Sequence, residues 1–324
     1  MNYLRPLVAY LKMFRFYNLF LPGASGLVGA TIASFFEGTY NIERIFAGTL
    51  IPILFWGAGQ VVNNYFDQYA DRINHNQTSI VKGDIGSNKA LYTSLIITAI
   101  LIIISFRIDI LAGIISIVGV VAYFAYCIKL KGIPLIGNTW FGFATSLCVL
   151  FGSAVSVGIQ PFVFHPVIWI IFGLNGIFQG GHVLIGYFKD VKGDEEGGYK
   201  TLCVVFKNNL KAVALITLIY TIVPVFLGLI AWLYHGGHCI QNANYLLFQI
   251  FSLMISLHAQ IMLINNPSPI GGYASFSMHK TSVTLYFLSW LASFIPIFYA
   301  VIIMAVSVGF IEFSKKNTKT TMQL

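Results

Sequence analysis

The chain has 324 residues, of which 57% are hydrophobic and only 9% are charged, with a mean hydropathy of +0.79 and a net charge of +8. Soluble domains carry about a quarter charged residues, so this composition excludes an ordinary soluble protein. Apolar runs of about twenty residues recur without alternation along the chain, which favours membrane-spanning helices over a barrel. We expect an all-α polytopic membrane protein that forms one domain over residues 1–324.

Nine transmembrane helices around a central cavity are predicted, at 16–35, 45–62, 92–106, 110–127, 139–158, 166–186, 210–233, 244–264 and 283–308. With the N-terminus in the cytoplasm, the inner segments hold 14 Lys and Arg and the outer segments hold 5, as the positive-inside rule requires. The outer five are Arg44, Arg107, Lys315, Lys316 and Lys319. An eight-span alternative moves the C-terminal tail inside. The basic excess is thus mainly topological, and we expect a cell inner membrane location and no nucleic-acid partner.

The second predicted span runs into NNYFDQYADRIN, in which Asn63, Asp67 and Asp71 follow one another at spacings of four. On a continuing helix these three side chains project from one face, one turn apart. Two carboxylates at that spacing repel each other, and screening water is scarce near a membrane. A bound cation would remove the repulsion.

The sixth predicted span runs into YFKDVKGDEEGGYKTL, in which Asp190 and Asp194 repeat the same spacing. A lone Asp-x-x-x-Asp in a cytoplasmic loop is usually a solvated surface. Two copies, each at the inner end of an apolar helix and flanked by Lys or Arg, favour a function. Two facing carboxylate pairs suit magnesium, which typically combines one or two carboxylates with substrate phosphate oxygens.

This pair of motifs resembles that of the UbiA superfamily of intramembrane prenyltransferases, which carry Asn-x-x-x-Asp-x-x-x-Asp after the second span and Asp-x-x-x-Asp after the sixth. The resemblance implies two magnesium ions, replaceable by manganese, that bridge the diphosphate of an isoprenyl donor. The implied metal ligands are Asn63, Asp67, Asp71, Asp190 and Asp194, and the four aspartates are the implied catalytic residues. Cytoplasmic loops 63–91 and 187–210 would close the mouth of the cavity.

Basic residues near these motifs are candidates for binding the diphosphate together with Asn63. They are Arg15, Arg72, Lys82, Lys129, Lys131, Lys189 and Lys200. Arg15 and Asn18 in MFRFYN, and Tyr126 with the two lysines of YCIKLKGIPLIGN, look like positions of the family. The alternative for Lys129 and Lys131 is that they are topology lysines snorkelling at the membrane surface.

One segment departs from the family pattern. Many aromatic prenyltransferases of the family continue with Arg-Pro-x-Arg-Pro-x-x-x-Gly, and this chain has HNQTSIVKG, with His75 and Thr78 in place of the arginines. Either Lys82 and Arg72 take over part of the phosphate contact, or this region handles a different acceptor.

Polar residues inside the sixth span, Gln179 and His182, either line an acceptor pocket or bond a neighbouring helix. The candidate acceptor pocket consists of Asn18, Tyr126, Gln179, His182 and Tyr187.

The expected reaction moves an isoprenyl group from an allylic diphosphate to a hydrophobic, aromatic or lipid-like acceptor and releases diphosphate. The first alternative is a UbiA-type terpene cyclase, in which a double bond of the donor's own chain captures the cation. The second is an ion-coupled transporter. It is disfavoured because the acids lie at the membrane edge, whereas transporter sites usually lie near the midplane.

Overall fold

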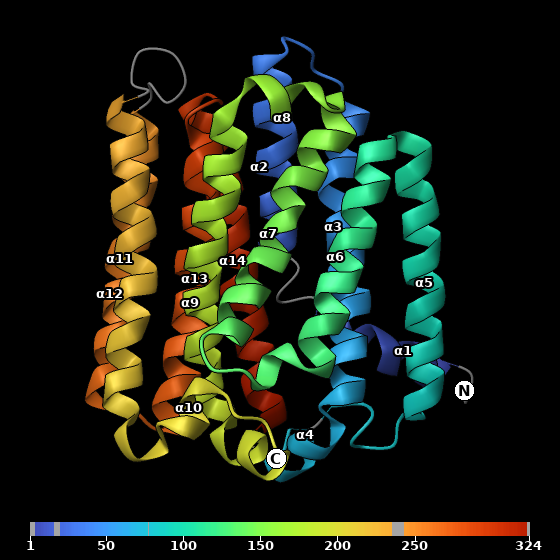
Figure 1. Cartoon of the computed structure of the whole chain (residues 1–324), viewed down its shortest axis with the longest axis vertical. Helices are drawn as coiled ribbons and strands as arrows, with labels where there is room; N and C mark the ends of the chain where they lie inside the picture. The colour runs from blue at the N-terminus through green and yellow to red at the C-terminus, as the bar shows by residue number, and fades with distance from the viewer. Residues whose placement is uncertain (1–3, 16–19, 77, 235–242, 323–324) are drawn as a thin grey trace.

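The computed structural model describes residues 4–15, 20–76, 78–234 and 243–322. These residues form helices and connecting turns without a strand, which confirms the all-α fold. The long helices lie side by side in one bundle, and α1, α4 and the chain's C-terminus lie toward its lower end in Figure 1.

The first half of the bundle contains α1 (Leu4–Met13), α2 (Phe20–Phe36), α3 (Ile42–Phe66), α4 (Gln68–Ile73), α5 (Ser87–Ile108), α6 (Ile110–Ile128), the 3-10 turn η2 (Leu130–Gly132) and α7 (Ile136–Val157). The second half contains α8 (Gln160–Phe164), α9 (Pro166–Glu196), α10 (Leu202–Val205), the turn η3 (Lys207–Asn209), α11 (Leu210–Tyr234), α12 (Ala243–Asn265), α13 (Pro269–Ala292) and α14 (Ile297–Met322).

Length and composition allow seven helical segments of the described chain to cross a membrane, namely those built on α3, α5, α6, α7, α9, α11 and α12. Residues Leu21–Phe36 and Ile297–Phe313 form shorter apolar helices. Local capping marks the boundaries of some helices. The Asp109 carboxylate, for example, accepts hydrogen bonds from the backbone N–H groups of Leu111 and Ala112 and so starts α6 one residue after α5 ends.

The ninth predicted span, 283–308, is wrong as one helix, because it covers the end of α13 and the start of α14. Pro296 stands at the break, where its ring and its missing N–H prevent the helix from continuing. The stretch 269–282, predicted as a loop, is helical. Its small and polar side chains, including Ser275, His279 and Ser282, are buried against neighbouring helices rather than exposed to lipid, so hydropathy does not detect them.

This break also changes where the tail lies. Phe294, between α13 and α14, packs on Phe35 and Phe36 at the end of α2. Further from this break, the Thr281 hydroxyl of α13 donates a hydrogen bond to the Glu312 carboxylate of α14, so the two helices run antiparallel. Helix α14 therefore runs back to the end of the bundle that holds α4 (Figure 1). The prediction that Lys315, Lys316 and Lys319 lie at the opposite end is wrong, and of the five residues assigned there only Arg44 and Arg107 remain.

Close helix packing holds α9, which carries the second aspartate motif. A Cβ on Gly142 of α7 would lie 2.6 Å from the backbone nitrogen of Gly180 on α9. Only glycine permits this approach, as is common between membrane helices. The position of α9 is therefore set by backbone contact with α7.

Candidate active site

The first motif crosses a break between two helices. Helix α3 ends at Phe66 and α4 begins at Gln68, with Asp67 between them. The helical hydrogen-bond pattern nevertheless continues, because the N–H of Asp67 donates to the carbonyl of Asn63 and the N–H of Asp71 donates to the carbonyl of Asp67, each at 2.8 Å. Asn63, Asp67 and Asp71 therefore remain one turn apart on one face.

Asn74, which follows the first motif, is hydrogen-bonded to the segment that carries the second. The Asn74 side chain accepts a hydrogen bond from the N–H of Gly193 at 2.8 Å and donates to the carbonyl of Asp190 at 3.4 Å. A Cβ at Gly193 would lie 2.5 Å from the carbonyl oxygen of Ala70, so glycine is what lets α4 approach α9. The two motif-bearing segments are thus held against each other at the lower end of the bundle (Figure 1).

One pocket contains both motifs. Its lining includes twelve of the residues predicted from sequence, namely Arg15, Asn63, Asp67, Asp71, Tyr126, Lys131, Gln179, His182, Tyr187, Lys189, Asp190 and Asp194. Side chains from residues more than a hundred positions apart in the sequence thus line the same pocket. The aspartate pairs and the basic residues lie together with the polar residues of the sixth span.

Lys131 is the central cation of this pocket. Its Nζ lies 2.8 Å from Asp67 Oδ1 and 3.1 Å from Asp194 Oδ1, so it joins the two motifs. The Lys131 side chain is 8% exposed and that of Asp194 is fully buried. Burial alone would lower the pKa of Lys131, but the Asp67 and Asp194 carboxylates together raise it well above its ordinary value. Lys131 therefore stays positively charged.

Two further cations belong to this pocket. Lys189 Nζ pairs with Asp190 Oδ2 at 2.7 Å, and the Arg15 guanidinium donates to Asn64 Oδ1 at 2.7 Å. Three basic side chains and four carboxylates therefore share one partly enclosed volume.

Some carboxylate oxygens are buried without a hydrogen-bond partner. Asp71 Oδ2 and Asp194 Oδ2 are of this kind, whereas Asn76 donates to Asp71 Oδ1 at 2.8 Å and Lys131 forms its ion pair with Asp194 Oδ1. Burial raises the pKa of Asp71, an effect that Arg15 and the Asn76 hydrogen bond oppose. Hard, unsatisfied oxygens in a buried site fit a divalent cation such as magnesium. No three His, Cys, Asp or Glu side chains within the described ranges are yet gathered closely enough to hold one.

The candidate acceptor residues lie deeper in the same pocket. Tyr126 and Tyr187 are buried and their hydroxyl groups lie 3.2 Å apart. Gln179 and His182 are also buried on the pocket side of α9. Asn18 lies outside the described residues.

Four predicted diphosphate-binding residues lie elsewhere. Arg72, Lys82, Lys129 and Lys200 are exposed, and none of them lines this pocket. The structure thus places Lys131, and not its neighbour Lys129, at the aspartates.

Sequence reasoning missed several lining residues, notably Trp56, Gln60, Asn74, Asn76 and Phe276. For Trp56 and Gln60 a signal was present, because they precede Asn63 on α3 at helical spacing. Asn74 and Asn76 lie in the polar run that follows the first motif, and no spacing distinguished them from their neighbours.

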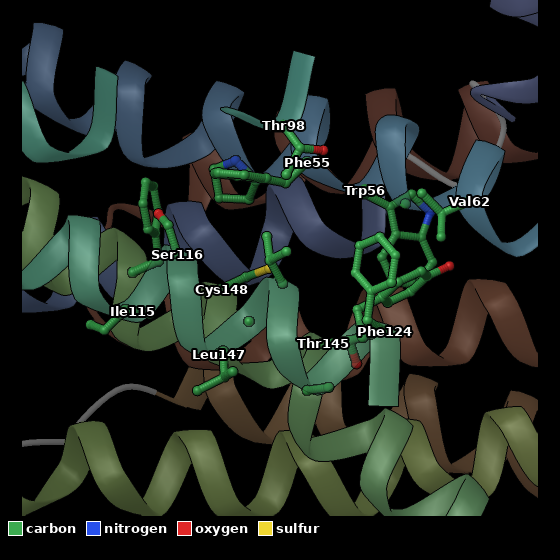
Figure 2. Close-up of a pocket in the computed structure, with 17 residues that line it drawn as sticks. Phe55, Trp56, Val62, Thr98, Ile115, Ser116, Phe124, Thr145, Leu147 and Cys148 are labelled. Atoms are coloured by element: carbon green, nitrogen blue, oxygen red, sulfur yellow. The ribbon is translucent and has the colours of Figure 1, made fainter. Parts of the chain in front are cut away.

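A second, apolar pocket adjoins the first. Helices α3, α5, α6 and α7 line it, and Trp56 lines both pockets. Figure 2 shows Trp56, Val62 and Phe124 at one end and Ile115 and Ser116 towards the other. Pro52 and Val62 both contact this pocket, and ten residues of α-helix separate them by roughly 15 Å. The pocket therefore extends from the start of the first motif into the apolar part of the bundle.

Comparison with known proteins agrees with this architecture. The model of the UbiA prenyltransferase family matches residues 23–283. The chain is 29% identical over 239 residues to a digeranylgeranylglyceryl phosphate synthase of Methanobrevibacter smithii, covering 72% of this chain and 81% of the relative. A relative of the same name in Methanosphaera stadtmanae is 27% identical and covers 75% of this chain and 83% of its own length.

Solved structures show the same fold. A UbiA homologue from Aeropyrum pernix matches with a TM-score of 0.66 at 16% identity, over 89% of this chain and 97% of that one. A UbiA homologue from Archaeoglobus fulgidus, solved with GPP and Mg²⁺, matches with a TM-score of 0.60 at 15% identity, over 90% and 99%.

Proposed function

From the premise that this chain belongs to the UbiA prenyltransferase family and is a prenyltransferase, we propose that it transfers an isoprenyl group from an allylic diphosphate to an aromatic or lipid-like acceptor in a magnesium-dependent reaction. The observation that carries this proposal is the single pocket in which four aspartates meet Arg15, Lys131 and Lys189. Family membership excludes the transporter alternative, since the matched relatives are synthases.

Asn63, Asp67, Asp71, Asp190 and Asp194 would hold the metal, as two ions with manganese as a substitute. The unpartnered buried oxygens of Asp71 and Asp194 support this assignment, as does the Mg²⁺ in the Archaeoglobus fulgidus homologue. Bound magnesium would stabilise the charge that develops on the leaving diphosphate. Lys131 lies between Asp67 and Asp194 and balances their charge until the anion and its cations arrive.

Arg15, Lys131 and Lys189 would bind the diphosphate oxygens directly. Arginine offers a planar fork of donors and lysine a mobile point charge. The exposed Arg72, Lys82, Lys129 and Lys200 would instead attract the anionic donor towards the pocket, because clustered charge of one sign raises the local concentration of the opposite charge.

The apolar pocket next to Trp56 would hold the isoprenyl tail. It begins beside the first motif, and its lining is almost wholly apolar or aromatic. Burial away from water would protect the allylic cation from hydrolysis, and Trp56 offers a π face where the two pockets meet.

Gly119→Leu should shorten the accepted donor. Gly119 lines the apolar pocket, and only the tip of Leu147 lies within 4 Å of where its Cβ would be, at 3.8 Å. The new side chain should therefore fill the pocket without displacing backbone. We expect kcat/KM for geranylgeranyl diphosphate to fall by about 10-fold or more relative to geranyl diphosphate.

Gly173→Leu is the matched control, since Gly173 also has open space at its Cβ but lies outside both pockets. An equal loss of both donors in Gly119→Leu, or none, would place the tail elsewhere.

The name of the relatives suggests the first acceptor to test. Their name describes a glyceryl phosphate that carries two geranylgeranyl groups, so the molecule lacking one of these groups is the acceptor to offer first. The decisive assay is mass spectrometry of products from purified protein, magnesium and donors of increasing length, with this acceptor, a phenolic acceptor, native lipid extract or none. A product equal to donor hydrocarbon plus acceptor supports transfer. A hydrocarbon or alcohol formed equally well from donor alone would instead identify a cyclase.

We further propose that the aspartate end of the bundle faces the cytoplasm. The supporting observation is the charge distribution, since α14 returns its basic tail to this end and leaves Arg44 and Arg107 at the other. In cells, Lys82→Cys on a cysteine-free background should resist an impermeant thiol reagent, while Arg44→Cys should react. The reverse pattern would invert the orientation.

A further inference from the structure

A pair of buried histidines extends from the pocket into the bundle. His182 of α9 lines the pocket, and its Nδ1 lies 3.3 Å from Nδ1 of His279 on α13, whose side chain is fully buried. Two nitrogens at this distance share one proton, so one ring donates and the other accepts. Nothing in the proposed metal or diphosphate site uses either ring.

The two imidazoles are fixed in orientation by aromatic stacking. The His182 ring lies against Phe276 with centroids 4.2 Å apart and an interplanar angle of 12°, and it is parallel to His279 within 12°. His279 in turn stacks on Phe178 at 5.5 Å. A ring clamped in this way presents its remaining nitrogen, Nε2, in one direction, which is how a reacting group is pre-oriented.

His182 stands on the same helix face as the aspartates. His182, Gly186, Asp190 and Asp194 follow at spacings of four along α9, so each lies one turn from the next. His182 is therefore roughly 12 Å deeper than Asp190 along the axis. Gly186, which also lines the pocket, lies between them, and the Phe276 ring comes within 3.0 Å of the position that a Cβ would take there. A diphosphate held at Asp190 would place its allylic carbon on the pocket side of Gly186, with His182 beyond it.

His182 is a neutral base at this position. Lys189 and Lys280 flank the Phe276 ring at 5.7 and 5.0 Å, and these cations keep the His182 imidazole uncharged before the acceptor reacts. Asp67 and Asp194 are engaged by Lys131, and the two tyrosine hydroxyls face each other. Among the described residues that line this pocket, His182 is the sole imidazole.

Resting on the proposed function, we propose that His182, oriented by His279, takes up the proton that the acceptor loses on prenylation. The allylic carbon–oxygen bond breaks and its electron pair leaves with diphosphate. The acceptor's hydroxyl oxygen, or its ring carbon, forms the new bond to the allylic carbon, and the displaced proton moves to Nε2 of His182. The proton then leaves through the pocket mouth when the products depart. His182 is the catalytic residue here and His279 is a positioning residue that accepts the hydrogen bond from Nδ1 of His182.

The central variant is His182→Asn, because asparagine retains a polar group near the Nδ1 position but cannot accept a proton under these conditions. Loss of a general base lowers the rate by about 10²- to 10⁴-fold. We expect such a loss in acceptor-dependent product formation from geranylgeranyl diphosphate and geranylgeranylglyceryl phosphate, or from the acceptor identified in lipid extract. Magnesium-dependent binding of the donor should stay within about 2-fold. Added imidazole should restore part of the rate in His182→Ala.

For His279, the test is rescue by a conservative variant. His279→Asn keeps a polar atom for Nδ1 of His182 and should retain more of kcat than His279→Leu, with the donor KM unchanged in both. His258→Asn is the matched control, because His258 is exposed on α12 and lies outside the pocket.

The two proposals fail differently. A wild-type protein that forms no transfer product with any acceptor contradicts the proposed function and this inference together. A wild-type protein that transfers while His182→Asn transfers equally well contradicts this inference alone. A parallel loss of donor binding and turnover in His182→Asn also overturns it, since His182 would then serve the donor.

Discussion

Replacing Asp67 or Asp190 with asparagine should reduce turnover of an allylic diphosphate by on the order of 10³-fold, and chelation of magnesium should do the same. The physical reason is that, with the metal held as proposed, each change would remove a negative oxygen ligand from the cation that offsets charge on the leaving group. Asparagine has nearly the shape of aspartate, and its amide oxygen can still accept from Lys131 in place of Asp67. The protein should therefore remain folded. The measurement is the rate of diphosphate release at fixed donor and varied magnesium.

Asp84→Asn is the control for this experiment. Asp84 is an exposed acid in the connection between α4 and α5, outside the pocket, and its replacement should leave the rate unchanged. Full activity of the wild-type protein in excess chelator would contradict the magnesium assignment. A comparable loss in Asp84→Asn would show that the effect comes from charge in general.

Much of the fold was predictable because the spans facing lipid are continuous apolar runs. The predicted spans 92–106 and 110–127 fall within α5 and α6. Many large apolar side chains of these two helices are exposed on the bundle surface. Helix α13 was not predictable in this way. Its face is built from Ser275, His279, Ser282 and other polar residues that bury against α9 and α12, so composition resembles a loop. Hydropathy therefore detects helices that face lipid and misses a polar helix that is buried inside the bundle.

For the candidate site, the aspartate motifs were visible because repeated spacing carries geometric information. A spacing of four places Asp67 and Asp71 on one face of any helix that contains them both. Contacts between distant segments have no such signature. The hydrogen bonds that Gly193 donates to Asn74 and that Arg15 donates to Asn64 depend on how the helices pack, so no local sequence pattern predicts them. The same holds for Lys131 and Lys129, which are equivalent in sequence but not in position.

Lys131→Met should destabilise the metal-free protein and make its stability depend strongly on magnesium. Lys131 compensates two carboxylates in a buried cluster, and removing one partner of a buried ion pair costs about 3–5 kcal/mol. Asp67 and Asp194 would then face each other without a cation. Magnesium bound at the proposed site would favour the folded state and should restore stability as its concentration rises, by the usual linkage of binding to folding. The midpoint of thermal unfolding, measured with and without magnesium, should therefore shift more in the variant than in the wild type.

The pH dependence follows from the direction of the Lys131 shift. Its pKa is raised in the folded protein by Asp67 and Asp194, so its contribution is fully present below the unfolded value near 10.5 and is lost only above it. Between neutral pH and pH 9 Lys131 should therefore stay charged in the wild-type protein. In Lys131→Met the pKa of Asp194, which burial raises and Lys131 lowers, should rise further, so the variant should lose stability relative to wild type as the pH rises through this range. Lys129 is an exposed neighbour with no ion pair among the described residues. Lys129→Met should therefore change neither the stability of the protein nor the dependence of that stability on magnesium. If Lys131→Met were as stable as Lys129→Met without magnesium, Lys131 would not be the cation that holds the two motifs together.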